Sequence, residues 1–250
     1  MVEVTELEAY CDGLLSAADF ADYCPNGLQV EAERPVRRLI SGVTASRALI
    51  DAAAADGADA ILVHHGWFWR GESPCLTGMK GRRVRALLGA GMSLLAYHLP
   101  LDAHPELGNN RCLADRLGFL DARATAAGGG LVWRGRLAEP APGALLAARL
   151  SEVLDHAVVQ VAVKAAPVEQ VAWCTGAAQG YIEEAAVLGV DAFISGEISE
   201  QTTHQARELG LDYLAAGHHA TERYGVQALG DHLAERFGIE HRFIDVDNPA

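Results

Sequence analysis

Short apolar runs alternate with Ala- and Leu-rich stretches of helical period along almost the whole of this 250-residue chain. Apolar runs of about four to eight residues that end in small or polar side chains are typical of buried strands. They predict strands at 38–44, 58–64, 92–98, 131–137, 157–163, 170–175, 190–195, 211–216 and 239–245. Helical period predicts helices at 5–17, 46–56, 79–90, 108–118, 142–154, 178–188, 199–210 and 222–237. This alternation of strand and helix predicts an α/β fold.

The chain also resembles itself. Shifted by 132 residues, 36–65 aligns with 168–197 without a gap and matches at eight of thirty positions. Duplication of a lobe would produce this pattern, although any two strand–helix–strand units share some of it. The glycine run 128–130 marks a boundary, so we expect two similar α/β lobes, 1–127 and 128–250, with mixed sheets flanked by helices.

Composition narrows the class of protein. Thirty-three acidic residues against twenty basic ones give a formal net charge of −13, which argues against general binding of nucleic acid. The five cysteines are odd in number and form no CxxC pair, as is typical of a reduced cytosolic protein. The first residues are acidic, and no apolar run reaches the roughly 18 residues of a spanning helix. We therefore expect a cytoplasmic protein without a membrane segment.

Three predicted strands, 58–64, 92–98 and 211–216, run into histidine at or just after their carboxyl ends. These histidines are His64 and His65, His98, and His218 with its neighbour His219. Ligands of open α/β sheets collect outside the carboxyl ends of strands, so we expect these side chains at a common edge. His64 and His65 are adjacent and would leave opposite faces of a strand, so both reach one site only where the strand has ended.

Two carboxylates accompany these histidines. Asp102 follows His98 by four residues, and because Pro100 lies between them we expect a loop over the strand ends. Glu222 follows His218 by four residues, a spacing that puts both on one side of a helix.

Imidazole nitrogens and carboxylate oxygens are donors that Zn, Mn, Fe, Co and Ni accept. His64, His65, His218, Asp102 and Glu222 are more donors than one open catalytic ion takes, and they fit two ions bridged by a carboxylate. Two divalent cations outweigh the two carboxylates, so the site would attract a small anionic substrate. A lone histidine at a strand end is usually a packing residue, which leaves His104 and His219 as uncertain neighbours and His241 without a metal role.

Four motifs, together with CPNGLQV at 24–30, carry a family resemblance. They are VHHGWFW at 63–69, YHLPLDAH at 97–104, SGEISEQ at 195–201 and GHHATERYG at 217–225. In this order they resemble the GTP cyclohydrolase 1 type 2 homologue family, whose members are also described as dinuclear metal centre hexameric proteins. The resemblance covers nearly the whole chain.

The resemblance implies two α/β lobes with the metal site at strand carboxyl ends between them, and a toroidal homohexamer whose metal sites face its cavity. It implies that His64, His65, Asp102, His218 and Glu222 bind two divalent ions, with Glu222 able to bridge them. His98 and Glu197 match positions close to the metals and are not firm ligands; for them we expect catalytic or supporting roles.

The expected function is hydrolysis of a small phosphorylated or nucleotide-like substrate by a metal-bound hydroxide. The family name alone does not establish opening of the GTP ring, because fold analogy does not fix a reaction. The alternative is a non-catalytic metal-binding ring that serves as a scaffold, metallochaperone or regulator. A third hypothesis is association with DNA, as in repair. It would require the basic cluster from Lys80 to Arg85 to contact the phosphates.

Overall fold

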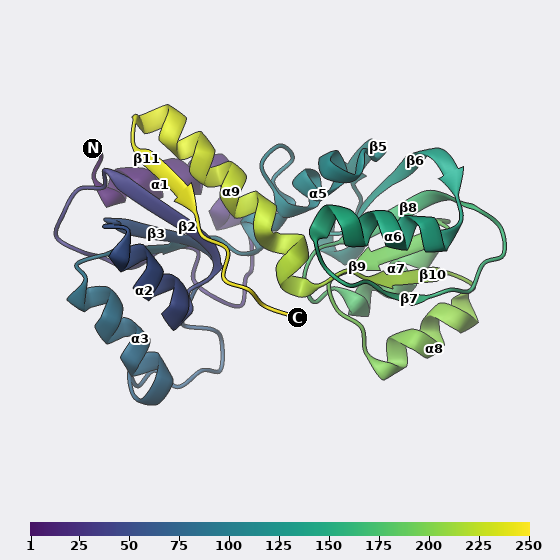
Figure 1. The fold of residues 1–250 in the computed structure, drawn as a ribbon, viewed down its shortest axis with the longest axis horizontal. Helices are drawn as coiled ribbons and strands as arrows, with labels where there is room; N and C mark the ends of the chain where they lie inside the picture. The colour runs from purple at the N-terminus through teal and green to yellow at the C-terminus, as the bar shows by residue number, and fades with distance from the viewer. The chain divides into compact units, whose positions relative to one another are not determined.

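The computed structural model describes residues 1–250 and contains two mixed sheets, each flanked by helices (Figure 1), which confirms the predicted α/β class. Packing contacts divide the chain into two units. Unit 1 comprises Met1–Leu101 and Val226–Asp247, and unit 2 comprises Asp102–Gly225 and Asn248–Ala250. The predicted lobes 1–127 and 128–250 stay a prediction.

The sheet of unit 1 has five strands in the order β1-β4-β3-β2-β11. Their bounds are β1 Gly27–Val30, β2 Arg38–Thr44, β3 Ala60–His65, β4 Ser93–Ala96 and β11 Glu240–Phe243. β1 runs antiparallel to β4, and the other four strands are parallel. The central strands are apolar and buried on both faces, as parallel strands covered by helices on each side must be.

Helices cover both faces of this sheet (Figure 1). On one side lie α1 (Val4–Leu15) and the unit 1 part of α9 (His218–Phe237), where Tyr10 meets Phe237 edge to face at 5.3 Å. The other side carries α2 (Arg47–Ala55) and α3 (Gly78–Gly89), which bury aliphatic side chains against the strands.

The sheet of unit 2 has six strands in the order β5-β6-β8-β9-β10-β7. Their bounds are β5 Leu120–Ala124, β6 Trp133–Ala141, β7 Val159–Val161, β8 Val168–Cys174, β9 Ala192–Ser195 and β10 Asp212–Ala215. The strands β8, β9 and β10 are parallel, and the remaining strands pair antiparallel.

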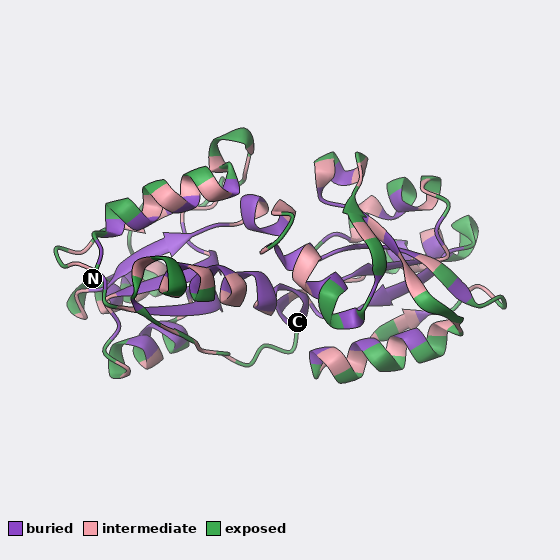
Figure 2. Ribbon diagram, turned by 90° about the horizontal axis from the view of Figure 1, so that it is seen from above, coloured by how far each residue is buried: buried purple, intermediate pink, exposed green.

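The helices of unit 2 are α5 (Asn109–Leu117), α6 (Gly143–Leu154), α7 (Ile182–Val187) and α8 (Glu200–Leu209). One core cluster joins α5 and α6 to the strands through Trp173, which is fully buried. Figure 2 shows the central strands of both sheets buried and the outer helix faces exposed. Short 3-10 turns, η1 (Ala17–Asp19), η2 (Ala127–Gly130) and η3 (Gln179–Tyr181), complete the fold.

The aligned segments of the internal repeat make the same unusual contact in each unit. Asp59 accepts hydrogen bonds from the backbone N–H groups of residues 37–38 at 2.8 and 3.0 Å. Asp191, at the matching position, accepts them from residues 169–170 at 3.0 and 2.9 Å. Each carboxylate thus ties the start of one parallel strand to the turn before the next. This shared contact supports the duplication better than the sequence matches alone.

All nine predicted strands are present. The sequence analysis missed β1 and β5, because β1 has only four residues and β5 is a five-residue edge strand whose side chains are mostly exposed. The predicted helices are also present, although α9 begins at His218, ahead of the expected 222.

The loop expected around Pro100 was wrong, because Leu99–Ala103 forms a short helix, α4. Pro100 lies in its first turn, where a backbone N–H would have no partner within the helix and the fixed φ of proline suits helical backbone. No helix of the structure is long and apolar enough to cross a membrane.

We predict that Asp59→Ala and Asp191→Ala each lower the free energy of unfolding by about 1–2 kcal/mol, because two backbone N–H groups lose their acceptor. Urea denaturation monitored by circular dichroism measures the change. The exposed pair of Asp51 with Arg47 provides the control, since Asp51→Ala should change stability little. Unchanged urea midpoints for both Asp59→Ala and Asp191→Ala would contradict the stabilising role of these contacts.

Candidate metal centre

Three imidazoles gather at the carboxyl edge of the unit 1 sheet. His64 and His65 are the last two residues of β3, and His98 follows β4. Ring centroids lie 4.7 Å apart for His64 and His65, 5.0 Å for His64 and His98, and 5.7 Å for His65 and His98. One nitrogen from each ring lies within 4.8 Å of the others, so this group could hold a metal ion.

We expected both rings to reach one site only where the strand has ended, and this condition was wrong, because β3 runs through His65, which pairs with Thr44. The two rings nevertheless converge on His98. They occupy the final two positions of the strand, where side chains can reach beyond the sheet edge. His64 is fully buried and its Nδ1 lies 2.9 Å from the carbonyl of Tyr97. Since a carbonyl only accepts, Nδ1 carries the proton in the neutral ring and Nε2 is the nitrogen able to bind a metal.

His98 contacts a carboxylate that sequence analysis missed. Its Nδ1 lies 2.7 Å from Oδ1 of Asp22. Burial opposes ionisation of Asp22, but hydrogen bonds from His98 and Asn26 together lower its pKa to about 2. Asp22 lies just before the CPNGLQV motif, and the only signal for its role was that proximity.

In unit 2, Asp102 is buried and held by two side chains. Its Oδ1 accepts hydrogen bonds from Nδ2 of Asn109 at 2.8 Å and from the hydroxyl of Thr175 at 3.2 Å. Asn109 in turn accepts from the backbone N–H of Gly225 at 2.8 Å. A carboxylate fixed in this way is oriented before any ligand arrives. Asn109 and Thr175 had no sequence signal of their own.

His218 and Glu222 lie one turn apart at the start of α9, as their spacing predicted. Nε2 of His218 lies 3.2 Å from Oε2 of Glu222, and its Nδ1 lies 2.7 Å from Oε1 of Glu197, which follows β9. Burial alone would lower the pKa of His218, but Glu222 and Glu197 outweigh it and raise that pKa to about 9. The structure therefore places the carboxylate of Glu197 in contact with Nδ1 of His218.

Gly176 shows that space beside this group is constrained. A Cβ at this position would collide with Oε1 of Glu222 and lie 3.2 Å from Nε2 of His218. Its φ of +70° is also unfavourable for other residues. Only glycine leaves the carboxylate and the imidazole in their present positions.

The donor set fits a borderline divalent metal. Unit 1 offers imidazole nitrogens, and unit 2 offers one imidazole with the carboxylates of Asp102 and Glu222, which suits Zn, Mn, Fe, Co or Ni better than Mg or Ca. Cys174 is near these carboxylates but does not fit. Its burial, and then the charges of Asp102 and Glu222, raise the pKa of this thiol well above its ordinary value, whereas a metal binds the thiolate.

Two further histidines, His104 and His241, make contacts outside these donor groups. Nδ1 of His104 accepts from the backbone N–H groups of Glu106 and Leu107 at 3.3 and 3.0 Å, which stabilises a turn. No metal role was expected for His241. It bridges Ser41 and Asp231, each at 2.8 Å. Because Ser41 is fully buried, this chain of contacts offers no nucleophile to a substrate.

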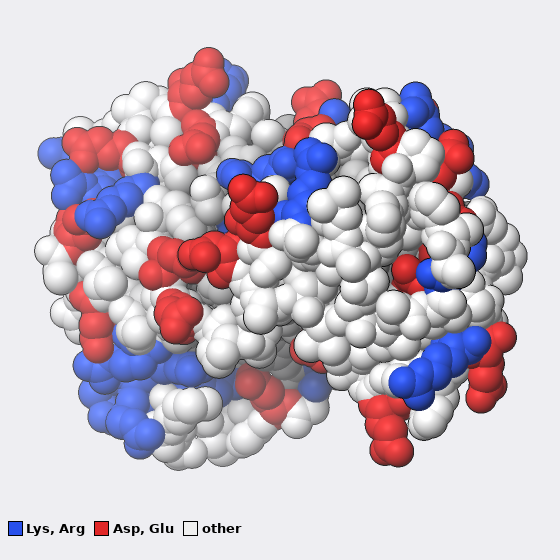
Figure 3. All heavy atoms as spheres, turned by 45° about the vertical axis from the view of Figure 1, so that its right-hand side comes forward, with Lys and Arg blue, Asp and Glu red and all other residues white.

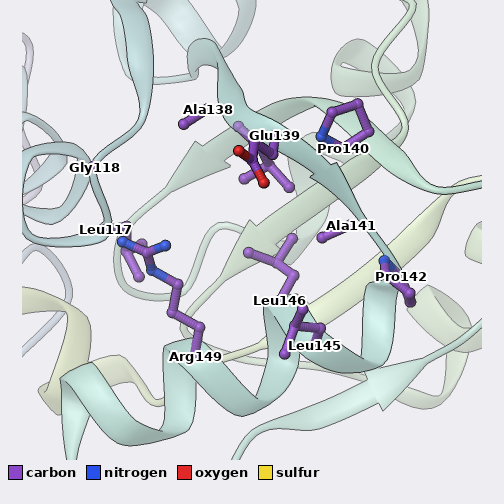
Figure 4. Close-up of a pocket in the computed structure, with 11 residues that line it drawn as sticks. Leu117, Gly118, Ala138, Glu139, Pro140, Ala141, Pro142, Leu145, Leu146 and Arg149 are labelled. Atoms are coloured by element: carbon purple, nitrogen blue, oxygen red, sulfur yellow. The ribbon is translucent and has the colours of Figure 1, made fainter.

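A separate pocket of about 350 Å³ lies on unit 2 (Figure 4). Its walls are aliphatic apart from Glu139 and Arg149, and it is lined by Leu117, Gly118, Leu137, Ala138, Glu139, Pro140, Ala141, Pro142, Leu145, Leu146 and Arg149. With a single carboxylate and no imidazole or thiol, it cannot be the metal centre.

The basic cluster lies on α3 of unit 1. Figure 3 shows basic side chains gathered at the lower left, where Figure 1 draws α3. Lys80 pairs with Glu72 at 3.0 Å and lies over the ring of Phe68, 4.7 Å from its centroid. Part of the positive charge is therefore neutralised locally.

The fold and these side chains define a class: a two-sheet α/β protein whose strand ends carry groups able to hold metal. A family model for Duf34/NIF3 (NGG1p interacting factor 3) matches residues 2–249. The chain belongs to the Duf34/NIF3 family, and the resemblance drawn from its motifs is confirmed.

Relatives called GTP cyclohydrolase 1 type 2 homolog occur in several bacteria. The protein of Allochromatium vinosum is 66% identical over 250 residues, which is 100% of this chain and 98% of the relative. That of Pseudomonas aeruginosa is 55% identical, with 100% and 99% covered.

Two solved structures are similar to this chain over its whole length. The protein ybgI, described as of unknown function, is 49% identical, with 100% of both chains covered and a TM-score of 0.95. TTHA1606 from Thermus thermophilus is 34% identical, with 100% of both chains covered and a TM-score of 0.89.

We predict that metal binding to His218 becomes tighter as pH rises. Below a pKa of about 9 the metal-free imidazole carries a proton that a ligand must lose. Apparent affinity should therefore rise by up to about tenfold per pH unit and level off above that pKa. Calorimetry in buffers of different ionisation enthalpy at neutral pH should detect proton release. The exposed His204 serves as the control, because His204→Gln should leave the release unchanged. Binding without proton release would contradict the prediction.

Proposed function

We propose that the chain is a metal-dependent hydrolase that binds two divalent ions and acts on a small phosphorylated or nucleotide-like substrate. The observation that carries the proposal is the pairing of oriented donors in each unit: His64, His65 and His98 in one, and Asp102, His218 and Glu222 in the other. His98 and Asp102 are only four residues apart, so donors of the two sets are neighbours along the chain.

In this proposal His64, His65, Asp102, His218 and Glu222 would hold the ions, and Glu222 would be able to contribute to both. When bound, two divalent ions supply an ionised water and a Lewis acid for the developing oxyanion. Asn109 and Thr175 keep the Asp102 carboxylate in one orientation. Glu197 holds Nδ1 of His218 and is the acid or base nearest to that ring.

The substrate class follows from charge. Two divalent cations outweigh the carboxylates of Asp102 and Glu222 and leave the site locally positive, while the chain as a whole carries −13. A small phosphate ester is compatible with both, whereas a long polyanion is repelled by the surface. The name of the relatives suggests a nucleotide, although it describes them only as homologues.

We also propose assembly into a toroidal homohexamer, as the family resemblance implies. Light scattering coupled to size-exclusion chromatography should then give about six times the 26.6 kDa mass of the chain. A monomer at micromolar concentration would contradict it.

Reconstitution of the metal-free protein tests the metal centre itself. After loading with Zn²⁺, Mn²⁺ or Co²⁺, elemental analysis should find two ions per chain, and incubation with mixed nucleotides and bis(p-nitrophenyl) phosphate should give turnover. Asp102→Asn and Glu222→Gln should each lower turnover by at least about 100-fold, because each removes an anionic ligand.

The matched control is Asp115→Asn, which makes the same chemical change on an exposed position of α5 and should leave loading and turnover unchanged. Full activity in either ligand variant would contradict the proposed site. Two tightly bound ions without turnover across the panel would instead favour a metal-binding scaffold, metallochaperone or regulator.

A further inference from the structure

Asp22 is a buried carboxylate whose two oxygens are fully used. It lies between η1 and β1, and its side chain is 3% exposed. Oδ1 accepts from Nδ1 of His98 at 2.7 Å and from the backbone N–H of Tyr23 at 2.6 Å. Oδ2 accepts from Nδ2 of Asn26 and from the backbone N–H of Leu99, both at 3.0 Å. Each oxygen therefore has two N–H partners.

This arrangement decides which nitrogen of His98 carries a proton. Three of the four partners are N–H groups that can only donate, and they reach both oxygens of Asp22, so the carboxylate has no proton to give. Nδ1 of His98 must then be the donor. In the neutral ring the lone pair is consequently on Nε2.

The residue is also held at its backbone. The N–H of His98 donates to Oδ1 of Asn26 at 2.7 Å, and Asn26 itself donates to Asp22. The ring packs edge to face against Trp69 at 5.0 Å between centroids. Ring plane and main chain of His98 are therefore both fixed while it faces the His64 and His65 pair.

We propose that Asp22 is a positioning residue for His98, and that His98, through Nε2, is a further nitrogen donor of the metal centre beside His64 and His65. A carboxylate that accepts from the far nitrogen of a metal-binding imidazole fixes its tautomer and increases its basicity. The inference rests on the proposed metal centre and adds to it a ligand and the residue that orients it.

Asp22 does not act as a ligand itself. Asp22, Cys24 and His98 also lie close enough together to hold an ion, but a metal on Asp22 would displace hydrogen bonds that stabilise the loop and the start of α4. Burial, together with the charge of Asp22, raises the pKa of the Cys24 thiol to about 12, so this sulfur stays protonated.

The test is a titration of the full-length metal-free protein with Co²⁺, followed by ligand-field absorption, which reports the number and type of donors. Asp22→Asn should weaken the binding of one ion by about 10–100-fold and change its absorption bands. Asparagine can still accept from the N–H of Leu99, but its NH₂ group cannot accept from the donors that face it. His98→Ala should cause at least the same loss.

Asp59→Asn is the matched control, because Asp59 is also a carboxylate of unit 1 that accepts two backbone N–H bonds but contacts no histidine. It should lower stability and leave the Co²⁺ affinity and spectrum unchanged. A folded Asp22→Asn or His98→Ala variant that binds Co²⁺ as the wild type does would overturn the inference while leaving the metal centre intact. Wild-type protein that takes up no Co²⁺ would overturn the proposed function as well.

Nitrogen-15 NMR of the imidazole rings keeps the test decisive if Asp22→Asn fails to fold. In the wild-type protein His98 should show a protonated Nδ1 and an unprotonated Nε2, and loading with Zn²⁺ should shift the Nε2 resonance. A protonated Nε2, or a resonance that Zn²⁺ leaves unchanged, would overturn the inference.

Discussion

The in-register pairing of parallel strands is the constraint on which both donor sets depend. In unit 1, Val63 pairs with Ala96, so the chain leaves β3 and β4 at the same level and delivers His64, His65 and His98 to one edge. In unit 2, Ser195 pairs with Cys174 on one side and Ala215 on the other, which aligns the exits of β8, β9 and β10. Because the side-chain period of a strand is two, a slip of one residue would turn every side chain to the opposite face.

The donor side chains are also held in one orientation by polar groups that are not themselves expected to be ligands. The carbonyl of Tyr97 sets the tautomer of His64, and Asp22 does so for His98. Asn109 fixes Asp102, and Glu197 fixes His218. In a buried site such contacts reduce the freedom that binding would otherwise have to remove, and they select which nitrogen can bind a metal.

The two aligned strand–helix–strand segments, 36–65 and 168–197, share a framework contact and differ in chemistry. Asp59 and Asp191 make the same backbone contact, because each ties together the starts of two strands far from the donor edge. At the opposite end, His65 of one repeat corresponds to Glu197 of the other. The contact that stabilises each sheet is thus the same in both segments, whereas the side chains at the strand exits differ.

The sequence by itself determined the α/β class, the nine principal strands and the histidine and carboxylate positions, because hydrophobic period and motif spacing are local properties. It missed β5, whose side chains are mostly exposed, and it misjudged Pro100, which the first turn of α4 accommodates. Only the tertiary structure decided that Asp22 orients His98, because these residues are 76 positions apart. A hydrogen bond between such distant residues leaves no period or spacing in the sequence, since only folding brings its donor and acceptor together.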